Sequence, residues 1–375
     1  MDLLDCKVMP YAWGSHTAIS SLLGRPAEGP EAELWMGAHP LAPSRSVART
    51  ESLDQLITRE PERELGARSL QAFGPRLPFL LKVLAAEQPL SLQAHPTMEQ
   101  AAAGFDDEER RGVPLTAPNR NYKDRSHKPE LLCALTPFDA LSGFRDFAQT
   151  LRLFEQLAVK ELDPFIKPTL SETFTAIMTA PKDVVPHVVA ACAKASPHFA
   201  RERALACRLD ELYPGDIGIV TALLLEYVTL QPGEAIFLDA GNMHAYLRGT
   251  GVEIMASSDN VLRGGLTPKH VDVPELTKTL RFDAPPARVL HPHEVDACES
   301  VYVTPAREFR LSRIVVNAAL VRETFGPEIL LVTEGAVHVG EVEVKRGASV
   351  FVPASTGRYA LGGDGVVYRA TTNLE

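Results

Sequence analysis

The chain has 375 residues, of which 45% are hydrophobic and 23% are charged, and its formal net charge is −10. This length exceeds what a single core usually holds and the composition is ordinary for a folded protein, so we expect two or three globular domains. The acidic balance argues against nucleic acid or an anionic membrane as the main partner, because neither would meet an attractive basic field.

The amino terminus and the cysteines give indications of the cellular compartment. The first ten residues, MDLLDCKVMP, have no basic segment followed by a long apolar one, so they predict no signal peptide. The five cysteines are odd in number, scattered and without a C-x-x-C pair, which is typical of buried thiols in a reducing compartment. We therefore expect a cytoplasmic protein without a membrane partner.

Residues 1–145 read as the first part of a β-rich domain, because proline and glycine separate short strand-like runs. The runs lie at 78–86, 90–95 and 129–135. Two helices are expected between strands, one with Ser52 as its N-cap and one in TMEQAAAGF (97–105) that ends at Gly104.

Over residues 146–227 the spacing of hydrophobic residues changes from a strand-like to a helix-like pattern. Apolar residues spaced three and four apart in FAQTLRLFEQL predict an amphipathic helix, and ARERALACRLDELY is also helical in pattern; the first places Phe147, Leu151, Phe154 and Leu157 on one face. The apolar run 217–227 contains Glu226 and is too short to cross a bilayer, so we interpret it as a buried helix. The segment predicts a helical insertion.

Strands return after residue 228, bounded by glycine at near-regular spacing, which favours a sandwich or closed barrel over a parallel sheet. GEAIFLDAGNMH (233–244) recurs 114 positions later as GASVFVPASTGR (347–358). The first copy resembles the second conserved motif of the cupin barrel, with Asp239 in place of its proline. The second copy has Arg358 where the first has His244, so it cannot bind a metal in the same way.

The predicted fold class is mainly β with a helical insertion, in which two cupin-like jelly-roll barrels accompany an α-helical domain. The catalytic barrel would comprise 1–145 and 228–280, the helical insertion 146–227, and a second barrel without a metal site 281–375.

Four side chains are candidate metal ligands. Gln93 and His95 stand two residues apart on an expected strand, so they share one face. His244 comes from the cupin-like motif, and Glu130 follows Pro129 at the start of another strand. Zinc held by these groups would keep a charge of about +1, enough to attract an oxyanion and polarise a hydroxyl or carbonyl.

Several cations lie close in sequence to these positions. Lys128, Arg263 and Lys269, with Glu253 among them, would together make a cationic pocket suited to a phosphorylated substrate. Each has an ordinary explanation when taken alone, as a solvated surface charge or a loop ion pair.

Five longer motifs carry a resemblance to a known family. They are YAWGSH (11–16), AELWMGAHP (32–40), LPFLLKVLAAEQPLSLQAHP (77–96), HKPELLCAL (127–135) and GNMHAYLRGTGVEIMASSDNVLRGGLTPKHVDVPEL (241–276). Through these motifs and their order, the chain resembles the type I mannose-6-phosphate isomerases of the cupin superfamily along nearly its whole length. The resemblance implies a zinc-dependent aldose–ketose isomerase that interconverts mannose 6-phosphate and fructose 6-phosphate through a cis-enediol or its anion.

The resemblance also implies roles for individual residues. One Zn²⁺ per chain would be held by Gln93, His95, Glu130 and His244, and Arg263 would be the catalytic arginine. The remaining pocket positions match Lys128, Ser91, Tyr246, Glu253 and Lys269.

Two questions stay open at the level of sequence. The proton-transfer base is Glu253, whose pKa burial beside Ile254 and Met255 would raise, or Lys128. The phosphate partners are Lys269 and Ser91, with Lys82 as a further candidate.

Two other function classes are alternatives at this level. An iron-dependent cupin oxygenase usually shows two histidines and a carboxylate, so Gln93 and the cations count against it. A non-catalytic sugar-phosphate-binding cupin would be expected to carry a DNA-binding or signalling domain, and the acidic chain has no obvious helix-turn-helix.

Overall fold

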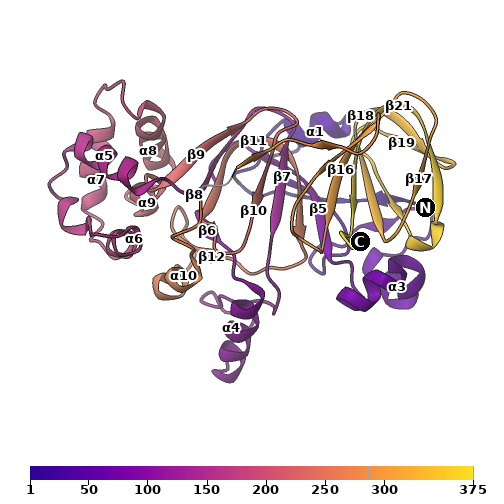
Figure 1. The fold of residues 1–375 in the computed structure, drawn as a ribbon, viewed down its shortest axis with the longest axis horizontal. Helices are drawn as coiled ribbons and strands as arrows, with labels where there is room; N and C mark the ends of the chain where they lie inside the picture. Colours follow the sequence, from indigo (N-terminus) through magenta and orange to yellow (C-terminus); the bar gives the residue numbers. More distant parts are fainter. Residues whose placement is uncertain (286–287, 375) are drawn as a thin grey trace.

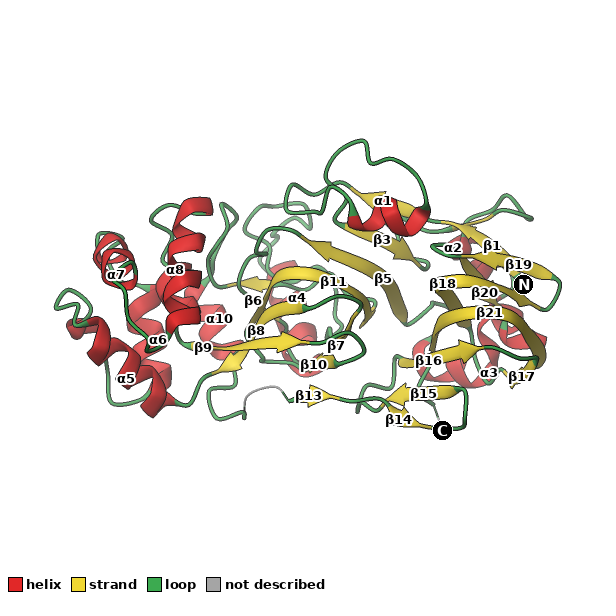
Figure 2. Cartoon of the chain, turned by 90° about the horizontal axis from the view of Figure 1, so that it is seen from above, coloured by secondary structure: helices red, strands yellow, loops and turns green. Residues whose placement is uncertain are grey.

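The computed structural model describes residues 1–285 and 288–374. Over these residues the strands form two antiparallel sheets, one of eleven strands and one of ten. The helices of residues 147–222 gather at one end of the molecule, the eleven-stranded sheet lies in the middle, and the ten-stranded sheet lies at the other end (Figures 1 and 2). The predicted sheet-rich chain with several helices is confirmed.

The eleven-stranded sheet is organised around one long strand, β11. The second half of β11 pairs with β5 and β7, and its first half pairs with β6 and β8. The strands are β2 (Lys7–Met9), β3 (Glu33–Met36), β5 (Phe79–Ala86), β6 (Gln93–Ala94), β7 (Glu130–Ala134), β8 (Phe138–Phe144), β9 (Leu225–Leu230), β10 (Ala235–Leu238), β11 (His244–Ala256), β12 (Leu262–Arg263) and β13 (Val289–Leu290).

The ten-stranded sheet joins both ends of the chain. Its main path runs β14-β15-β16-β21-β18-β20-β1-β4, with β17 on β21 and β19 on β18. The strands are β1 (Asp2–Asp5), β4 (Arg45–Ser46), β14 (His293–Glu294), β15 (Glu299–Tyr302), β16 (Arg310–Val316), β17 (Leu320–Glu323), β18 (Glu328–Val339), β19 (Val342–Lys345), β20 (Ser349–Val352) and β21 (Arg358–Thr371).

Strand pairing does not follow the predicted segment boundaries in full. β1 and β4 belong to 1–145 by sequence but pair within the sheet of the C-terminal strands, and β13, which follows residue 280, pairs with β10 of the other sheet. Long-range pairing depends on which strand edges meet in space, and a reading of local pattern does not contain that information.

Five α-helices lie between β8 and β9: α5 (Phe147–Leu157), α6 (Leu170–Met178), α7 (Val184–Cys192), α8 (Ala200–Leu212) and α9 (Gly218–Ala222). α5 starts where the Asp146 side chain accepts a hydrogen bond from Gln149 N, and it buries Phe154 and Leu157 as predicted, while Leu151 is 37% exposed. The helix predicted for 217–227 is wrong in its second half. α9 ends at Ala222, and the remaining apolar residues enter β9, because periodicity cannot separate short apolar helices from buried strands.

The other helices are α1 (Ala18–Leu23), α2 (Leu53–Arg59), α3 (Pro61–Phe73), α4 (Met98–Arg110) and α10 (Val273–Thr279). α2 begins after the Ser52 cap, as predicted. α4 does not end at Gly104. A Cβ there would lie 2.2 Å from the Tyr122 ring, so this glycine permits close packing and does not terminate the helix. No helix in the described ranges is long and apolar enough to span a bilayer.

The two faces of β5, β7 and β11 have different surroundings. One face packs against the ten-stranded sheet in a shared core that includes Val83, Leu131, Ile254, Leu331 and Phe351. Because successive side chains of a strand point to opposite faces, the intervening Lys82, Glu130 and Glu253 point to the other side, into the interior of the eleven-stranded sheet. The strands thus present polar groups to one enclosed space.

Candidate metal centre

Three of the predicted ligands meet in space. One ligand atom from each of His95, Glu130 and His244 lies within 4.8 Å of the others, and all three side chains are buried. His95 Nε2 lies 3.3 Å from Glu130 Oε1, and His244 Nε2 lies 3.4 Å from Glu130 Oε2. Glu130 and His244 are the first residues of β7 and β11, and His95 directly follows β6, so three separate segments supply the cluster.

Backbone carbonyls orient both imidazoles. His95 Nδ1 lies 2.7 Å from the Asn260 carbonyl oxygen, and His244 Nδ1 lies 3.1 Å from the Asn242 carbonyl oxygen. A proton on each Nδ1 satisfies these contacts and leaves each Nε2 with a lone pair directed at Glu130. Burial lowers the pKa of His95 to about 4, which favours its neutral ring.

This arrangement calls for a cation. His95 Nε2, His244 Nε2 and Glu130 Oε2 are buried and have no hydrogen-bond partner among the described residues, so lone pairs face lone pairs. Tetrahedral bonds of about 2.0–2.1 Å separate ligand atoms by roughly 3.4 Å, which matches the two imidazole–carboxylate distances. The two imidazoles and one carboxylate therefore fit a divalent cation of zinc's size.

Strand register places two more predicted residues beside this cluster. Gln93 is the partner of His244 between β6 and β11, and it is also the partner of Arg263 between β6 and β12. Directly paired residues of antiparallel strands project from the same face. His244, Gln93 and Arg263 therefore form one row across three strands, and the row begins at the metal centre.

Three cations gather near the end of that row. Burial lowers the pKa of Arg263, and partial burial together with the Arg263 charge lowers the pKa of Lys269, although the residue is exposed overall. Burial is also the largest effect on Lys123, whose pKa Arg120 and Arg263 lower further. Among the described residues, no carboxylate forms an ion pair with Arg263, Lys269 or Lys123. Their positive charge remains available to an anionic ligand.

A buried network of charges adjoins the ligands. Glu253 accepts a hydrogen bond from the Tyr246 hydroxyl at 2.9 Å and contacts Lys82 Nζ at 3.1 Å. Lys82 Nζ also lies 3.4 Å from Glu33 Oε1, and the Trp35 indole donates to Glu33 Oε2 at 2.8 Å. Burial raises the pKa of Glu253 despite the Lys82 charge. This carboxyl group is suited to exchange protons.

The other predicted site residues lie around this centre. Lys128 Nζ forms an ion pair with the Glu130 carboxylate, 3.1 Å from Oε1. Ser91 is half-buried next to Leu92, whose backbone hydrogen-bonds with Gly264 and Gly265 of the loop after Arg263. Lys269 is exposed at the far end of that loop.

Sequence reasoning misses two features. It suggests Lys82 only as a phosphate partner, but in the structure Glu33 and Glu253 enclose this lysine. The sequence does contain a signal for this, because a single lysine inside the apolar run PFLLKVLAA is expected to be buried, and a buried lysine requires charged partners. No sequence pattern singles out Asn260. Its side chain accepts from Lys123 N at 2.7 Å and donates to Ser126 O at 2.8 Å, while its own carbonyl orients His95.

Comparison with known proteins gives consistent matches. Residues 1–147 match the family model for the catalytic domain of type I phosphomannose isomerase. The mannose-6-phosphate isomerase of Escherichia coli (strain K12) is 38% identical, with 100% of both chains covered. The mannose-6-phosphate isomerase of Rattus norvegicus is 33% identical over 94% of this chain and 93% of its own.

Solved structures agree with the sequence matches. A zinc-bound mannose 6-phosphate isomerase superposes with a TM-score of 0.91 at 36% identity, covering 100% of this chain and 99% of its own. The Salmonella typhimurium mannose 6-phosphate isomerase bound to substrate and zinc has a TM-score of 0.91 at 36% identity, with 100% of both chains covered. The chain belongs to the type I phosphomannose isomerase family.

Proposed function

We propose that this protein is a zinc-dependent isomerase that interconverts mannose 6-phosphate and fructose 6-phosphate. The observation that carries the proposal is the buried cluster of His95, Glu130 and His244, whose unpaired lone pairs converge on one point. The family relationship supplies the substrate, and the solved relatives with bound zinc and bound substrate support the cofactor and ligand.

The metal ligands are His95, Glu130 and His244, with Gln93 as the fourth. Gln93 is supported by its register opposite His244. When bound, zinc supplies Lewis-acid polarisation of the sugar oxygens O1 and O2. Lys128, which contacts Glu130, adds positive charge beside the same carboxylate.

The reaction moves a proton between C1 and C2 after the sugar ring opens. Removal of the C2 proton of the aldose gives an enediol or its anion, and return of a proton to C1 gives the ketose. Glu253 is the proton acceptor in our proposal, because it is buried and its pKa is raised. Lys128 is the competing candidate, but its Nζ forms an ion pair with Glu130 in this arrangement.

Negative charge develops on O1 and O2 during this transfer, and fixed positive groups directed there lower the barrier. Arg263 is the group assigned to this role, because its guanidinium is half-buried and has no carboxylate partner in the described chain. Lys269 and Ser91 are the proposed phosphate partners. Lys82 is excluded from that role, since two carboxylates already hold it.

We also infer that each sheet belongs to a cupin-like jelly-roll barrel. A shift of 114 positions carries β10, Ala235–Leu238, onto β20, Ser349–Val352, and carries the first residue of β11 onto the first residue of β21. The proposed division keeps a catalytic barrel from 1–145 and 228–280, a helical insertion at 146–227 and a second barrel at 281–375. β1, β4 and β13 each pair in the sheet of the other proposed barrel, and this pairing joins the two barrels.

The test couples metal content to turnover. Purified protein should convert mannose 6-phosphate, lose activity on chelation and regain it with zinc at one ion per chain. The variant Arg263→Ala should fold and keep its zinc but lose about a hundredfold or more in turnover, because one preorganised contact to the developing charge is removed. Activity that survives complete chelation would refute the metal assignment, and near-normal turnover of Arg263→Ala would refute the role of Arg263.

A further inference from the structure

The helical segment sends one carboxylate to the loop that follows Arg263. Asp216 stands just before α9, and its Oδ1 accepts hydrogen bonds from Gly218 N at 2.7 Å and from Leu266 N at 2.9 Å. Its Oδ2 accepts from Thr267 N at 3.3 Å. One side chain therefore caps the first turn of α9 and holds two consecutive backbone amides of the loop between Arg263 and Lys269.

The loop adopts a conformation that needs such support. Leu266 has φ of 56°, in the left-handed region that residues other than glycine rarely occupy, and it is 1% exposed. A strained conformation of this kind persists where the surrounding contacts over-determine it. The hydrogen bonds of Asp216 fall on Leu266 itself and on the next residue, so they stabilise the strained position directly.

Two glycines bring the helix and the loop into contact. A Cβ on Gly218 would lie 2.6 Å from Leu266 N, and a Cβ on Gly265 would lie 2.5 Å from the Gly218 Cα atom. On its other side the loop is fixed to the strand that carries the ligands, because Leu92 N donates to Gly265 O at 3.1 Å and Gly264 N donates to Leu92 O at 2.8 Å. The loop is therefore held between α9 and the chain entering β6.

We propose that Asp216 is a positioning residue for the isomerisation, which sets Arg263 and Lys269 in place by holding the loop between them. The inference rests on the proposed function, in which these two cations contact the substrate. In this proposal the helical segment contributes to catalysis, since Asp216, which lies outside both sheets, fixes the backbone path of the loop 263–269. A misplacement of about 1 Å at a catalytic group can cost roughly a hundredfold in rate, so the effect is measurable.

The test compares substitutions on either side of the contact with a matched control. Asp216→Ala removes the acceptors, Asp216→Asn keeps one oxygen acceptor, and Gly218→Ala introduces a clash with the loop without changing charge. Asp210→Ala is the control, because Asp210 accepts from Gly215 N at 3.1 Å in the same connection but makes no hydrogen bond to 263–269 among the described residues.

We expect Asp216→Ala to fold and retain its zinc, with a melting temperature somewhat below that of Asp210→Ala because three backbone hydrogen bonds are lost instead of one. Its kcat should fall about ten- to hundredfold, and competitive inhibition by inorganic phosphate should weaken, because Arg263 and Lys269 both shift. Asp216→Asn should recover part of the loss and Gly218→Ala should reproduce it. In the double variant Asp216→Ala/Arg263→Ala the two effects on kcat should add less than fully, because part of the Asp216→Ala loss acts through Arg263.

Two results overturn the inference at different points. If Arg263→Ala is impaired while Asp216→Ala matches Asp210→Ala in kcat, KM and phosphate inhibition, the positioning role is wrong and the proposed function stands. If Arg263→Ala is fully active, the assignment of Arg263 fails and the positioning role fails with it.

Discussion

Lys82 and Glu253 show how the buried charges of the site depend on one another. Burial opposes the charge of Lys82, yet Glu33 and Glu253 raise its pKa above the usual value. Burial raises the pKa of Glu253, and Lys82 limits that rise. Because its pKa is raised, Glu253 is a stronger proton acceptor than an exposed carboxylate, and the Lys82 charge keeps its ionised form accessible.

The pH dependence of turnover separates the two candidate bases. Glu253 is faced by Lys82 from β5, Glu33 from β3, Tyr246 from its own strand, and Glu130 and Lys128 from β7 and the residues before it. A base must be unprotonated, so wild-type kcat/KM should fall on the acidic side of its pKa. Glu253→Gln should lose most turnover together with this acidic limb, while Lys128→Met should lose turnover but keep the limb.

The measurement is a kcat/KM profile across pH for each variant at equal zinc content. Lys82→Met serves as a further control, because loss of the cation should raise the pKa of Glu253 and move the acidic limb to higher pH. A profile for Glu253→Gln that keeps the wild-type acidic limb would assign the proton transfer to another group.

The sequence identifies the residues of the centre but not their arrangement. His95, Glu130 and His244 can be selected from motifs, and their convergence follows only from resemblance to a family. The row of His244, Gln93 and Arg263 depends on which strands pair and in what register, and local spacing does not contain this. The contacts of Asp216 could not be predicted from the sequence, because its partners, Leu266 and Thr267, are about fifty positions away.

At the scale of elements, local signals locate helices better than strand partners. The Ser52 cap and the period of α5 give correct helix starts, because caps and amphipathic faces are properties of neighbouring residues. The predicted end of α4 and the predicted helix across α9 and β9 are wrong. In both places tertiary contacts decide the outcome, through Tyr122 packed on Gly104 and through the pairing of β9 with β8.

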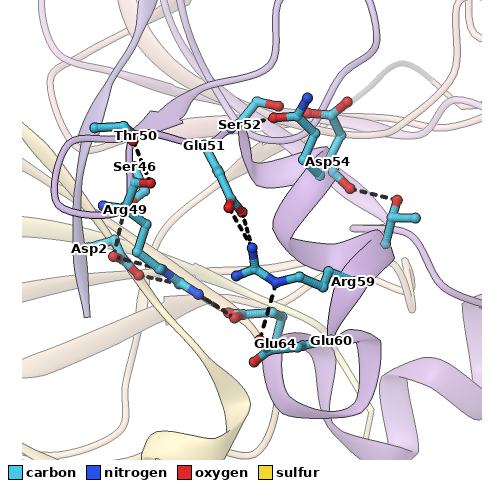
Figure 3. Close-up of polar contacts among 12 residues, drawn as sticks. Asp2, Ser46, Arg49, Thr50, Glu51, Ser52, Asp54, Arg59, Glu60 and Glu64 are labelled. Carbon is cyan, nitrogen blue, oxygen red and sulfur yellow. Dashed lines mark hydrogen bonds and ion pairs between the residues drawn. The ribbon is translucent and has the colours of Figure 1, made fainter.

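Arg49 joins three elements whose contacts no local pattern predicts. Its guanidinium donates to Asp2 on β1 at 3.0 Å through Nε and to Glu64 on α3 at 2.7 Å through Nη1, and Ser46 on β4 also donates to Asp2 (Figure 3). Burial disfavours the charge of Asp2, but hydrogen bonds from Arg49 and Ser46 hold its pKa below the usual 3.8. Arg49 thereby joins the N-terminal strand of the ten-stranded sheet to α3.

Asp2→Asn should therefore destabilise the fold in a pH-dependent way. A carboxyl whose folded pKa is depressed contributes stability above its unfolded pKa, and the contribution is lost as pH falls through the folded value. We expect a cost of about 1.5–3 kcal/mol at neutral pH, the usual range for a hydrogen bond to a charged group. The cost should shrink below about pH 4.

Denaturant unfolding of the metal-free protein at several pH values measures this difference without interference from zinc release. Glu51→Gln is the matched control, because Glu51 pairs with Arg59 at the exposed surface in the same region and its loss should have little effect at any pH (Figure 3). An Asp2→Asn deficit that is constant from neutral to acidic pH would contradict the ion-pair explanation.

At the scale of the whole molecule, glutamates at equivalent positions of the two sheets have different partners. Glu130 of β7 pairs with Leu238 of β10, and Glu328 of β18 pairs with Val352 of β20, the residue that lies 114 positions after Leu238. Glu130 faces two imidazoles and the candidate metal position. Glu328 instead accepts a hydrogen bond from Arg369 Nε at 3.0 Å and from the Tyr359 hydroxyl at 2.7 Å.

Arginine thus takes the place of a metal cation in the second sheet. Arg369 also contacts Glu299 Oε1 at 3.4 Å, and Arg322 contacts Glu299 Oε2 at 2.9 Å, so two arginines balance two buried glutamates. Within the described chain, internal pairing gives both carboxylate oxygens of Glu328 a partner, in contrast to Glu130. The same fold position can therefore serve a metal site in one sheet and structural stability in the other.

This comparison predicts that Arg369→Met destabilises the protein strongly and leaves the catalytic centre intact. Removing one partner of a buried ion pair strands the opposite charge and typically costs about 3–5 kcal/mol. The double variant Glu328→Gln/Arg369→Met should recover much of this cost, because no buried carboxylate is left unpaired at position 328. Thermal unfolding measures the stability, and zinc content and kcat of the folded fraction measure the centre. The interpretation fails if Arg369→Met melts like wild type, or if the folded fraction loses its zinc, because the second sheet would then support the metal site.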